Sequence, residues 1–250
     1  GAIVTAGAKP VFCDVGNDYN INPSEIESKI TNKTKAIIPV HWAGKPCAMD
    51  EINKIANSFN LKVIEDACHA IQGEYNEKRC GSLGDIGCFS FHPLKNLNVW
   101  GDGGIVTTNN KEIAEKIKLI RNHGLVNRDT CIEFAYNSRL DTIQAVVANY
   151  KMRNKLDNIT RKRISNSIML DKLLAKNKNI TLVKRHKHLK EVFHLYHINV
   201  KKKGHFIIVL HSYYDSYITT NFMKYMKKTK TDKVLSSCCR KKRNFDNVYK

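Results

Sequence analysis

The chain has 250 residues, 42% of them hydrophobic, which is enough to bury one sizeable core and excludes a disordered or fibrous protein. No leader-like N-terminus and no run of about 18 apolar residues occurs, so we expect a soluble, cytoplasmic protein without a membrane partner. The net charge of +19 arises in the last 100 residues. Residues 1–150 carry 16 basic and 17 acidic side chains, whereas residues 151–250 carry 26 basic and 6 acidic ones. A function located in the first 150 residues therefore does not depend on an excess of charge.

Short β-branched runs alternate with helical patterns over the first 125 residues, which is typical of a mostly parallel sheet covered by helices. Strands are expected at residues 11–15, 35–42 and 61–66, a short helix from Asn22, and a longer helix over residues 48–60. The strand at 61–66 ends in two carboxylates. Ligands of open α/β sheets bind outside the carboxyl ends of the strands, so a site is expected there.

Further elements are expected along the chain to about residue 176. We expect a small hairpin over residues 74–80, strands at 87–91 and 105–108, and a helix over 111–123 that Gly124 ends. Residues 141–176 indicate a long helix or a helix pair, with apolar positions diluted by basic ones. Beyond Gly204 the sequence has no usable periodicity, and we assign no fold to residues 205–250.

Three segments follow one another in the first half of the chain: VIEDACHAIQG (63–73), GSLGDIGCFSFHPLKNL (81–97) and GDGGIVTTN (101–109). Together they resemble the DegT-type sugar aminotransferases, a branch of the aspartate-aminotransferase fold (fold type I) of pyridoxal-phosphate (PLP) enzymes. The resemblance covers about residues 1–174. It implies an α/β fold with a mostly parallel sheet sandwiched by helices, the PLP-binding large domain, in residues 1–150, and a partial, smaller C-terminal α+β region in residues 151–250.

The resemblance implies roles for two residues near the ends of neighbouring strands. Lys95, in SFHPLKN, matches the lysine that holds PLP as a Schiff base, which requires an amine projected from a rigid strand end. Asp66 matches the carboxylate that pairs with the PLP ring nitrogen and keeps it protonated. Without the resemblance, Lys95 is interpreted as a surface lysine and Asp66 as a helix cap.

Four more residues are expected to contact the cofactor on the same grounds. His69 matches a residue near the phenolic oxygen, and Ser90 matches a serine at the phosphate. Asn137 and Arg139, in YNSRL, match residues that reach the phosphate end of the neighbouring subunit's cofactor, where their donors suit an anion. The resemblance therefore implies a homodimer with shared active sites. Trp42 is interpreted as a core residue.

The sequence also departs from the family pattern. Family members are longer, and we expect this chain to lack the N-terminal part, including the G-T-x-A helix start whose amides cradle the phosphate, and to have an aberrant C-terminus. The GDGG run at 101–104 is not a dinucleotide fingerprint, because its spacing and the following element are wrong. The eight cysteines show no zinc spacing, so buried free thiols and no metal are expected.

The function expected from this resemblance is transfer of an amino group, with glutamate as donor, to a keto group of a nucleotide-linked deoxysugar. Three alternatives stay open. A catalytically silent paralogue would keep the fold alone. A PLP-dependent sugar dehydratase is disfavoured by Lys95, because those relatives have histidine there. A nucleic-acid-binding protein would use the basic C-terminal region, although no helix-turn-helix, zinc or RNA-recognition pattern occurs.

Overall fold

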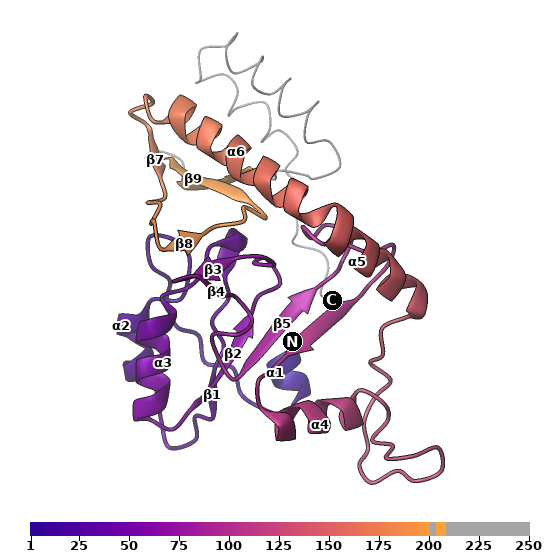
Figure 1. Ribbon diagram of the computed structural model, residues 1–250. Coiled ribbons are helices and arrows are strands. Elements are labelled where there is room, and N and C mark those ends of the chain that lie inside the picture. The colour runs from indigo at the N-terminus through magenta and orange to yellow at the C-terminus, as the bar shows by residue number, and fades with distance from the viewer. Residues whose placement is uncertain (201–203, 209–250) are drawn as a thin grey trace, which may run out of the picture. The chain divides into compact units, whose positions relative to one another are not determined.

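A four-stranded sheet is the central feature of the computed structural model, which describes residues 1–200 and 204–208 (Figure 1). Its strands are β1 (Ala36–Ile37), β2 (Lys62–Asp66), β5 (Ile86–Ser90) and β6 (Gly104–Thr107), in the order β1-β2-β5-β6. The first three are parallel, and β6 is antiparallel to β5. The predicted α/β fold with a mostly parallel sheet is confirmed, with one antiparallel strand whose direction the sequence pattern did not indicate.

The predicted strand at residues 11–15 is wrong. Only Val15 is paired, in a single antiparallel bridge to Ile21. Phe12 is 88% exposed, so its side chain gains nothing from a pleated surface packed on a core.

The predicted strand at residues 35–42 is correct in place and too long. A regular ladder is limited to β1, because Pro39 has no N–H to donate. The chain then turns through a 3-10 segment, η2 (Trp42–Gly44), in which Ala43 has a φ of 57°. Between the two, Val40 makes one parallel bridge to Asp66, which keeps this segment beside β2.

Six α-helices and a second 3-10 helix accompany the sheet within the described residues. They are α1 (Ala2–Thr5), α2 (Pro23–Ile26), η1 (Glu27–Lys29), α3 (Met49–Ser58), α4 (Lys111–Ile120), α5 (Thr142–Asn154) and α6 (Leu156–Leu174). Asn22 begins α2 as predicted, since its Oδ1 accepts the N–H of Ser24 at 3.2 Å. The pattern over 141–176 is a helix pair that breaks at Lys155.

Two apolar clusters hold the helices to the sheet. The first joins α2 and α3 to β1 and β2 and consists of Ile26, Ile37, Cys47, Met49, Ile52, Ala56, Leu61 and Val63. The second joins α5 and α6 to the segment after β5 and consists of Phe91, Leu97, Val99, Val147, Ala148 and Leu156. The segment that contains Lys95 is therefore anchored in a core.

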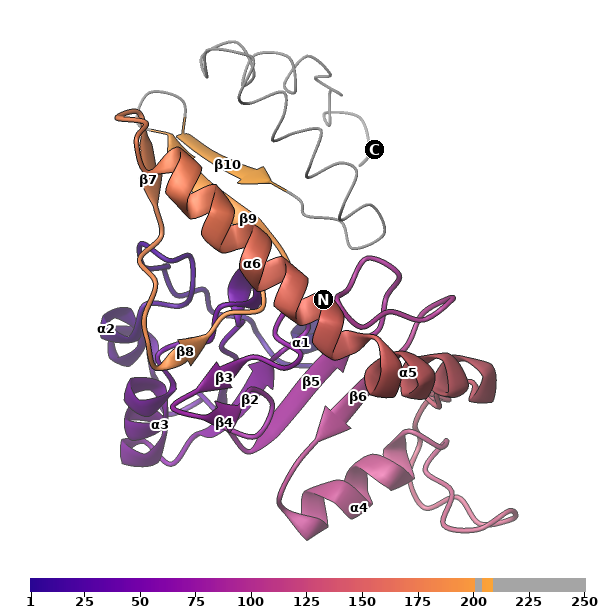
Figure 2. The same cartoon turned by 45° about the horizontal axis from the view of Figure 1, so that its top comes forward.

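Two small antiparallel sheets complete the described part. One contains β7 (Ile180–Leu182), β9 (Tyr196–Val200) and β10 (Gly204–Ile208), and the other β3 (Glu74–Tyr75), β4 (Lys78–Arg79) and β8 (Leu189–Lys190). Figure 2 shows α6 lying along β9 and β10. The boundary between residues 150 and 151 stays a prediction, and the basic sequence after residue 208 lies outside the described residues. Within residues 1–200 and 204–208, no helix has the length and apolar character of a membrane span.

Candidate active site

Parallel pairing brings Asp66 and Ser90 to one edge and one face of the sheet. Asp66 ends β2 and pairs with Cys88, while Ser90 ends β5 two residues later. Directly paired residues share a face, and so do residues two apart on a strand. Asp66 and Ser90 therefore project from the same face at the carboxyl edge. Glu65 projects from the opposite face.

Lys95 lies in a closed loop that follows β5. Its N–H donates to the carbonyl of His92 at 2.8 Å, and the N–H of Val99 donates to the carbonyl of Phe91 at 2.9 Å. Leu97 and Val99 are buried, so packing fixes the loop. Lys95 itself is half-buried.

His69 lies close enough to Asp66 and Lys95 for both charges to act on it. Burial, aided by Lys95 and opposed by Asp66, lowers the pKa of His69 to about 4, so the ring is neutral at neutral pH. The same charges act on Cys68, whose pKa is raised to about 12 by burial and by its bond to Asp66. Because the charges of Asp66 and Lys95 both act on His69, we refer to these three residues together as one cluster.

Two further aromatic rings lie against His69. The ring centroids of Trp42 and His69 are 5.5 Å apart, and those of His69 and His194 are 4.2 Å apart with an interplanar angle of 31°. Trp42 was expected in the core, and the sequence did not point to His194, which is 8% exposed. The available signal was a histidine within the apolar run VFHLY, where an imidazole needs a specific partner.

The segment that contains His194 is tied to the rest of the site. The N–H of Val192 donates to the carbonyl of Gly44 at 3.0 Å, and Asn96, which follows Lys95, donates from Nδ2 to the carbonyl of Val192 at 3.1 Å. Gly44 has a φ of 92°, and a Cβ there would lie 2.9 Å from the carbonyl oxygen of His69. Only glycine permits this approach of the two segments.

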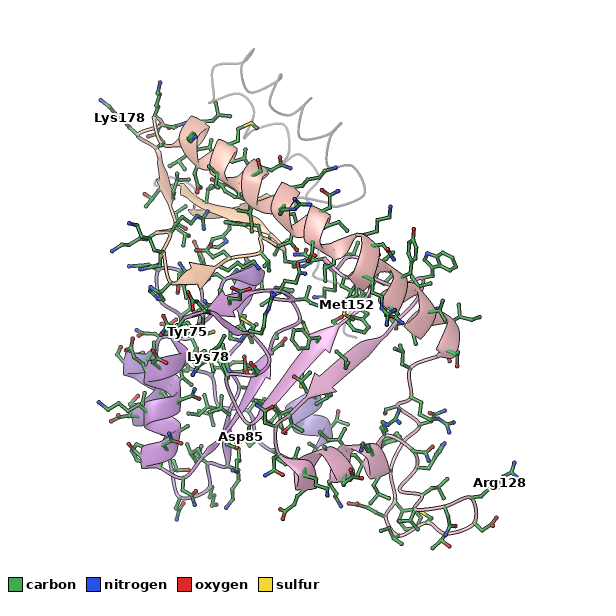
Figure 3. The ribbon with its side chains drawn as sticks, in the orientation of Figure 1. Tyr75, Lys78, Asp85, Arg128, Met152 and Lys178 are labelled. Atoms are coloured by element: carbon green, nitrogen blue, oxygen red, sulfur yellow. The ribbon has the colours of Figure 1, made fainter. Side chains whose placement is uncertain are left out.

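Asn137 and Arg139 lie apart from this cluster, on a segment that extends away from the sheet; Arg128, labelled in Figure 3, marks its outer part. Both residues are exposed. Nε of Arg139 donates to Oδ1 of Asn137 at 3.0 Å, and Nη1 donates to Asn122 at 2.8 Å. No hydrogen bond within the described chain joins them to the cluster, so their role at a neighbouring subunit's cofactor stays a prediction.

The cluster offers an unmet polar contact to a ligand. Nδ1 of His69 is buried and has no hydrogen-bond partner among the described residues, a state that an added polar group would relieve. A cavity of about 370 Å³ beside β3 and β8, lined by Glu74, Lys187 and Lys190 among others, contains none of the site residues. In the part of the chain that the structure describes, no three His, Cys, Asp or Glu side chains are placed to hold a metal ion.

An amine and a carboxylate near neighbouring strand ends, beside a neutral imidazole, suit an organic cofactor with an aldehyde group. On this α/β fold they define the class of aminotransferase-like enzymes. The chain belongs to the DegT/DnrJ/EryC1/StrS aminotransferase family, whose model matches residues 1–242. The match extends well past residue 174, where the resemblance was expected to fade.

Two relatives named as sugar aminotransferases are similar to this chain. It is 43% identical over 206 residues to the dTDP-3-amino-3,6-dideoxy-alpha-D-galactopyranose transaminase of Aneurinibacillus thermoaerophilus, covering 82% of this chain and 56% of the relative. It is 47% identical over 147 residues to the UDP-N-acetyl-3-dehydro-alpha-D-glucosamine 3-aminotransferase of Acidithiobacillus ferrooxidans, covering 58% of this chain and 40% of the relative.

A solved structure extends the comparison to a bound cofactor. The structure of NtdA from Bacillus subtilis, with bound cofactor PMP, matches with a TM-score of 0.72 and 32% identity, over 80% of this chain and 46% of that one. The chain spans about half the length of the curated relatives it matches.

Proposed function

We propose that the protein is a PLP-dependent aminotransferase that transfers an amino group, with glutamate as donor, to a keto group of a nucleotide-linked deoxysugar. The observation that carries the proposal is the cluster of Asp66, His69 and Lys95 at the carboxyl edge of the sheet, in a chain that belongs to this family. The relatives' names differ in nucleotide and sugar, so the proposal stops at the substrate class.

The residues present fit PLP. Lys95 would bind the cofactor through its amine and, once released, move a proton between the substrate's α-carbon and C4′ of the cofactor. Asp66 would hold the proton on the ring nitrogen. Nδ1 of His69, which lacks a partner among the described residues, would meet the phenolic oxygen. Bound PLP supplies an electron-withdrawing ring that stabilises negative charge at the substrate carbon.

Ser90 is proposed as a phosphate ligand. Its Oγ accepts the N–H of His92 at 3.3 Å, which fixes the hydroxyl and leaves its own O–H able to donate. A hydroxyl held in this way can orient an anion without adding charge to the site.

We also propose that the protein is a cytoplasmic homodimer with shared active sites. Large apolar side chains are exposed on the segment that carries Asn137 and Arg139: Ile132 is 63% exposed, Phe134 102% and Tyr136 76%. Such a patch is typical of an interaction site, and a second copy would cover it. All six cysteines in the described part are free, which suits a reducing compartment.

Absorption spectroscopy tests the activity. Wild-type protein mixed with PLP should develop a visible band, and glutamate should shift that band to shorter wavelength as the cofactor is aminated. After free PLP, which is itself coloured, has been removed, the Lys95→Ala variant should retain no band, whereas the control Lys111→Ala, which removes an exposed lysine of α4, should behave as wild type. A band that persists without Lys95 contradicts the proposal. A band that glutamate leaves unchanged contradicts glutamate as the donor, and a band that no amino acid changes favours the silent paralogue.

Mixing two inactive variants tests the shared site. If Arg139 serves the partner's cofactor, a dimer of one Lys95→Ala chain and one Arg139→Ala chain has one intact site. Activity should then return on mixing, although each variant alone lacks it. Mixtures that stay inactive while hybrid dimers form would place Arg139 in its own chain's site or outside the site.

A further inference from the structure

We infer that His41 and Glu65 form a positioning pair that sets the places of Asp66, Ser90 and Lys95 without contacting the cofactor. The inference rests on the proposed function, because it assigns a role toward the cofactor site. Glu65 and Asp66 are neighbours on β2, so their side chains leave opposite faces of the sheet. Asp66 faces the site, and Glu65 faces the core beneath it.

Glu65 is a buried carboxylate whose oxygens are fully used. Its side chain is 0% exposed. Oε2 accepts from Nε2 of His41 at 2.9 Å and from the N–H of Gly81 at 2.7 Å. Oε1 accepts from the N–H groups of Leu83 at 2.6 Å and Gly84 at 2.7 Å. Burial raises the pKa of this carboxyl, but these donors outweigh it and lower the pKa, so Glu65 is charged at neutral pH.

His41 connects Glu65 to the backbone of Asp66. Nδ1 of His41 accepts the N–H of Cys47 at 3.0 Å, so the ring proton lies on Nε2 and is donated to Glu65. The backbone N–H of His41 donates to the carbonyl of Asp66 at 3.1 Å. One fully buried residue therefore holds both the side chain of Glu65 and the main chain of Asp66.

The loop 81–84, whose N–H groups bind Glu65, is in close contact with β5. A Cβ on Gly87 of β5 would lie 2.3 Å from the Cα of Gly81, and a Cβ on Gly81 would lie 2.4 Å from the ring of Phe89. The carbonyl of Gly81 also accepts from Thr107 Oγ1 of β6 at 2.5 Å. Because the loop touches β5 this closely, a shift of the loop must move the strand that ends at Ser90.

Asp85 provides a matched control at the other end of β5, where Figure 3 labels it. Its carboxylate also ties β2 to β5, because Oδ2 accepts the N–H of Val63 at 2.9 Å and Oδ1 pairs with Lys62 at 3.0 Å. Replacing Asp85 by Asn therefore weakens the same pair of strands away from the carboxyl edge. A purely structural role for His41 and Glu65 predicts that all these variants behave alike.

The test compares Glu65→Gln, His41→Leu and His41→Gln with Asp85→Asn. The first two should bind PLP at least about tenfold more weakly than Asp85→Asn and shift the pH midpoint of the visible band, since Asp66 is displaced. His41→Gln retains a donor for Glu65, so it should recover much of the affinity and remains informative if the others do not fold. Affinities and band midpoints equal to those of Asp85→Asn would overturn the inference.

Hydrogen exchange on the cofactor-free chain separates this inference from the proposed function. The backbone N–H groups of Lys95 and Val99 donate hydrogen bonds within the loop after β5, which is far from Glu65 along the chain. They should exchange faster in Glu65→Gln and His41→Leu than in Asp85→Asn at matched thermal stability. If these amides exchange at the same rate in all three variants, the positioning role is wrong. If wild-type protein does not bind PLP, the proposed function is wrong, and the exchange rates alone then decide the positioning role.

Discussion

Acidification should destabilise the folded chain through His69, and the size of the effect follows from its surroundings. The ordinary pKa of 6.5 applies to the unfolded chain, whereas burial and Lys95 lower the pKa of His69 to about 4 in the folded chain. Between these values the unfolded state binds the proton and the folded state does not, so the free energy of unfolding falls as pH falls. The full shift corresponds to about 3 kcal/mol, of which about 2 kcal/mol is lost by about pH 5.

Urea unfolding of the cofactor-free chain, at about pH 7.5 and about pH 5, measures this loss. The His69→Gln variant cannot take up the proton, so between the two pH values it should lose about 2 kcal/mol less than wild type. His197, whose pKa burial also lowers to about 4, acts in the same direction, and Glu191, whose pKa burial raises, acts in the opposite one. Both effects are common to wild type and variant and cancel in the difference.

The exposed His123 provides the control, because His123→Gln makes the same substitution on the surface, outside the site. This variant should keep the pH dependence of wild type. If His69→Gln and His123→Gln lose equal stability on acidification, His69 is not held neutral by its site, and the reasoning about its role toward a cofactor oxygen fails with it.

Two further substitutions test how the elements around the site are held. Gly87→Ala should lower the free energy of unfolding by about 3 kcal/mol and the thermal midpoint by roughly 6 to 12 °C, because the new Cβ would lie 2.3 Å from the backbone of Gly81. In the control Gly101→Ala the new Cβ contacts only a flexible side chain, so the thermal midpoint should change far less. Asn110→Ala should cost about 1 kcal/mol in urea unfolding, because Oδ1 of Asn110 caps α4 by accepting the N–H of Ile113 at 3.0 Å; an unchanged midpoint would contradict the cap.

The sequence predicted the elements whose pattern is local. α3 and β2 follow directly from their apolar patterns. The parallel pairing of β2 with β5 explains why Asp66 and Ser90 meet at one edge. The hairpin over residues 74–80 was predicted with a three-residue turn, but the turn contains only Asn76 and Glu77, both with positive φ. Asn-Gly is the usual sequence for such a turn, and Glu77 gives no such signal.

The parts of the site that the sequence did not predict depend on contacts between distant segments. His194 lies 125 positions beyond His69, and no local period indicates that the two rings stack. The chain brings them together through the tight approach of Gly44 to the backbone near Phe193, which needs a positive φ and no side chain. A loop glycine is equally compatible with an ordinary turn or a helix end, so this approach becomes visible only in three dimensions.

The two acidic residues that end β2, Glu65 and Asp66, have different surroundings. Strand alternation sends Glu65 into the core, where His41 and three backbone N–H groups donate hydrogen bonds that stabilise its charge. The same alternation sends Asp66 to the open edge, where Cys68 alone provides its side-chain contacts in the described residues: the N–H donates to Oδ1 at 3.1 Å and the thiol also bonds to this carboxylate. A carboxylate that stabilises the fold and one that is proposed to pair with a cofactor thus differ by one residue, because several backbone donors surround the first and a single backbone donor meets the second.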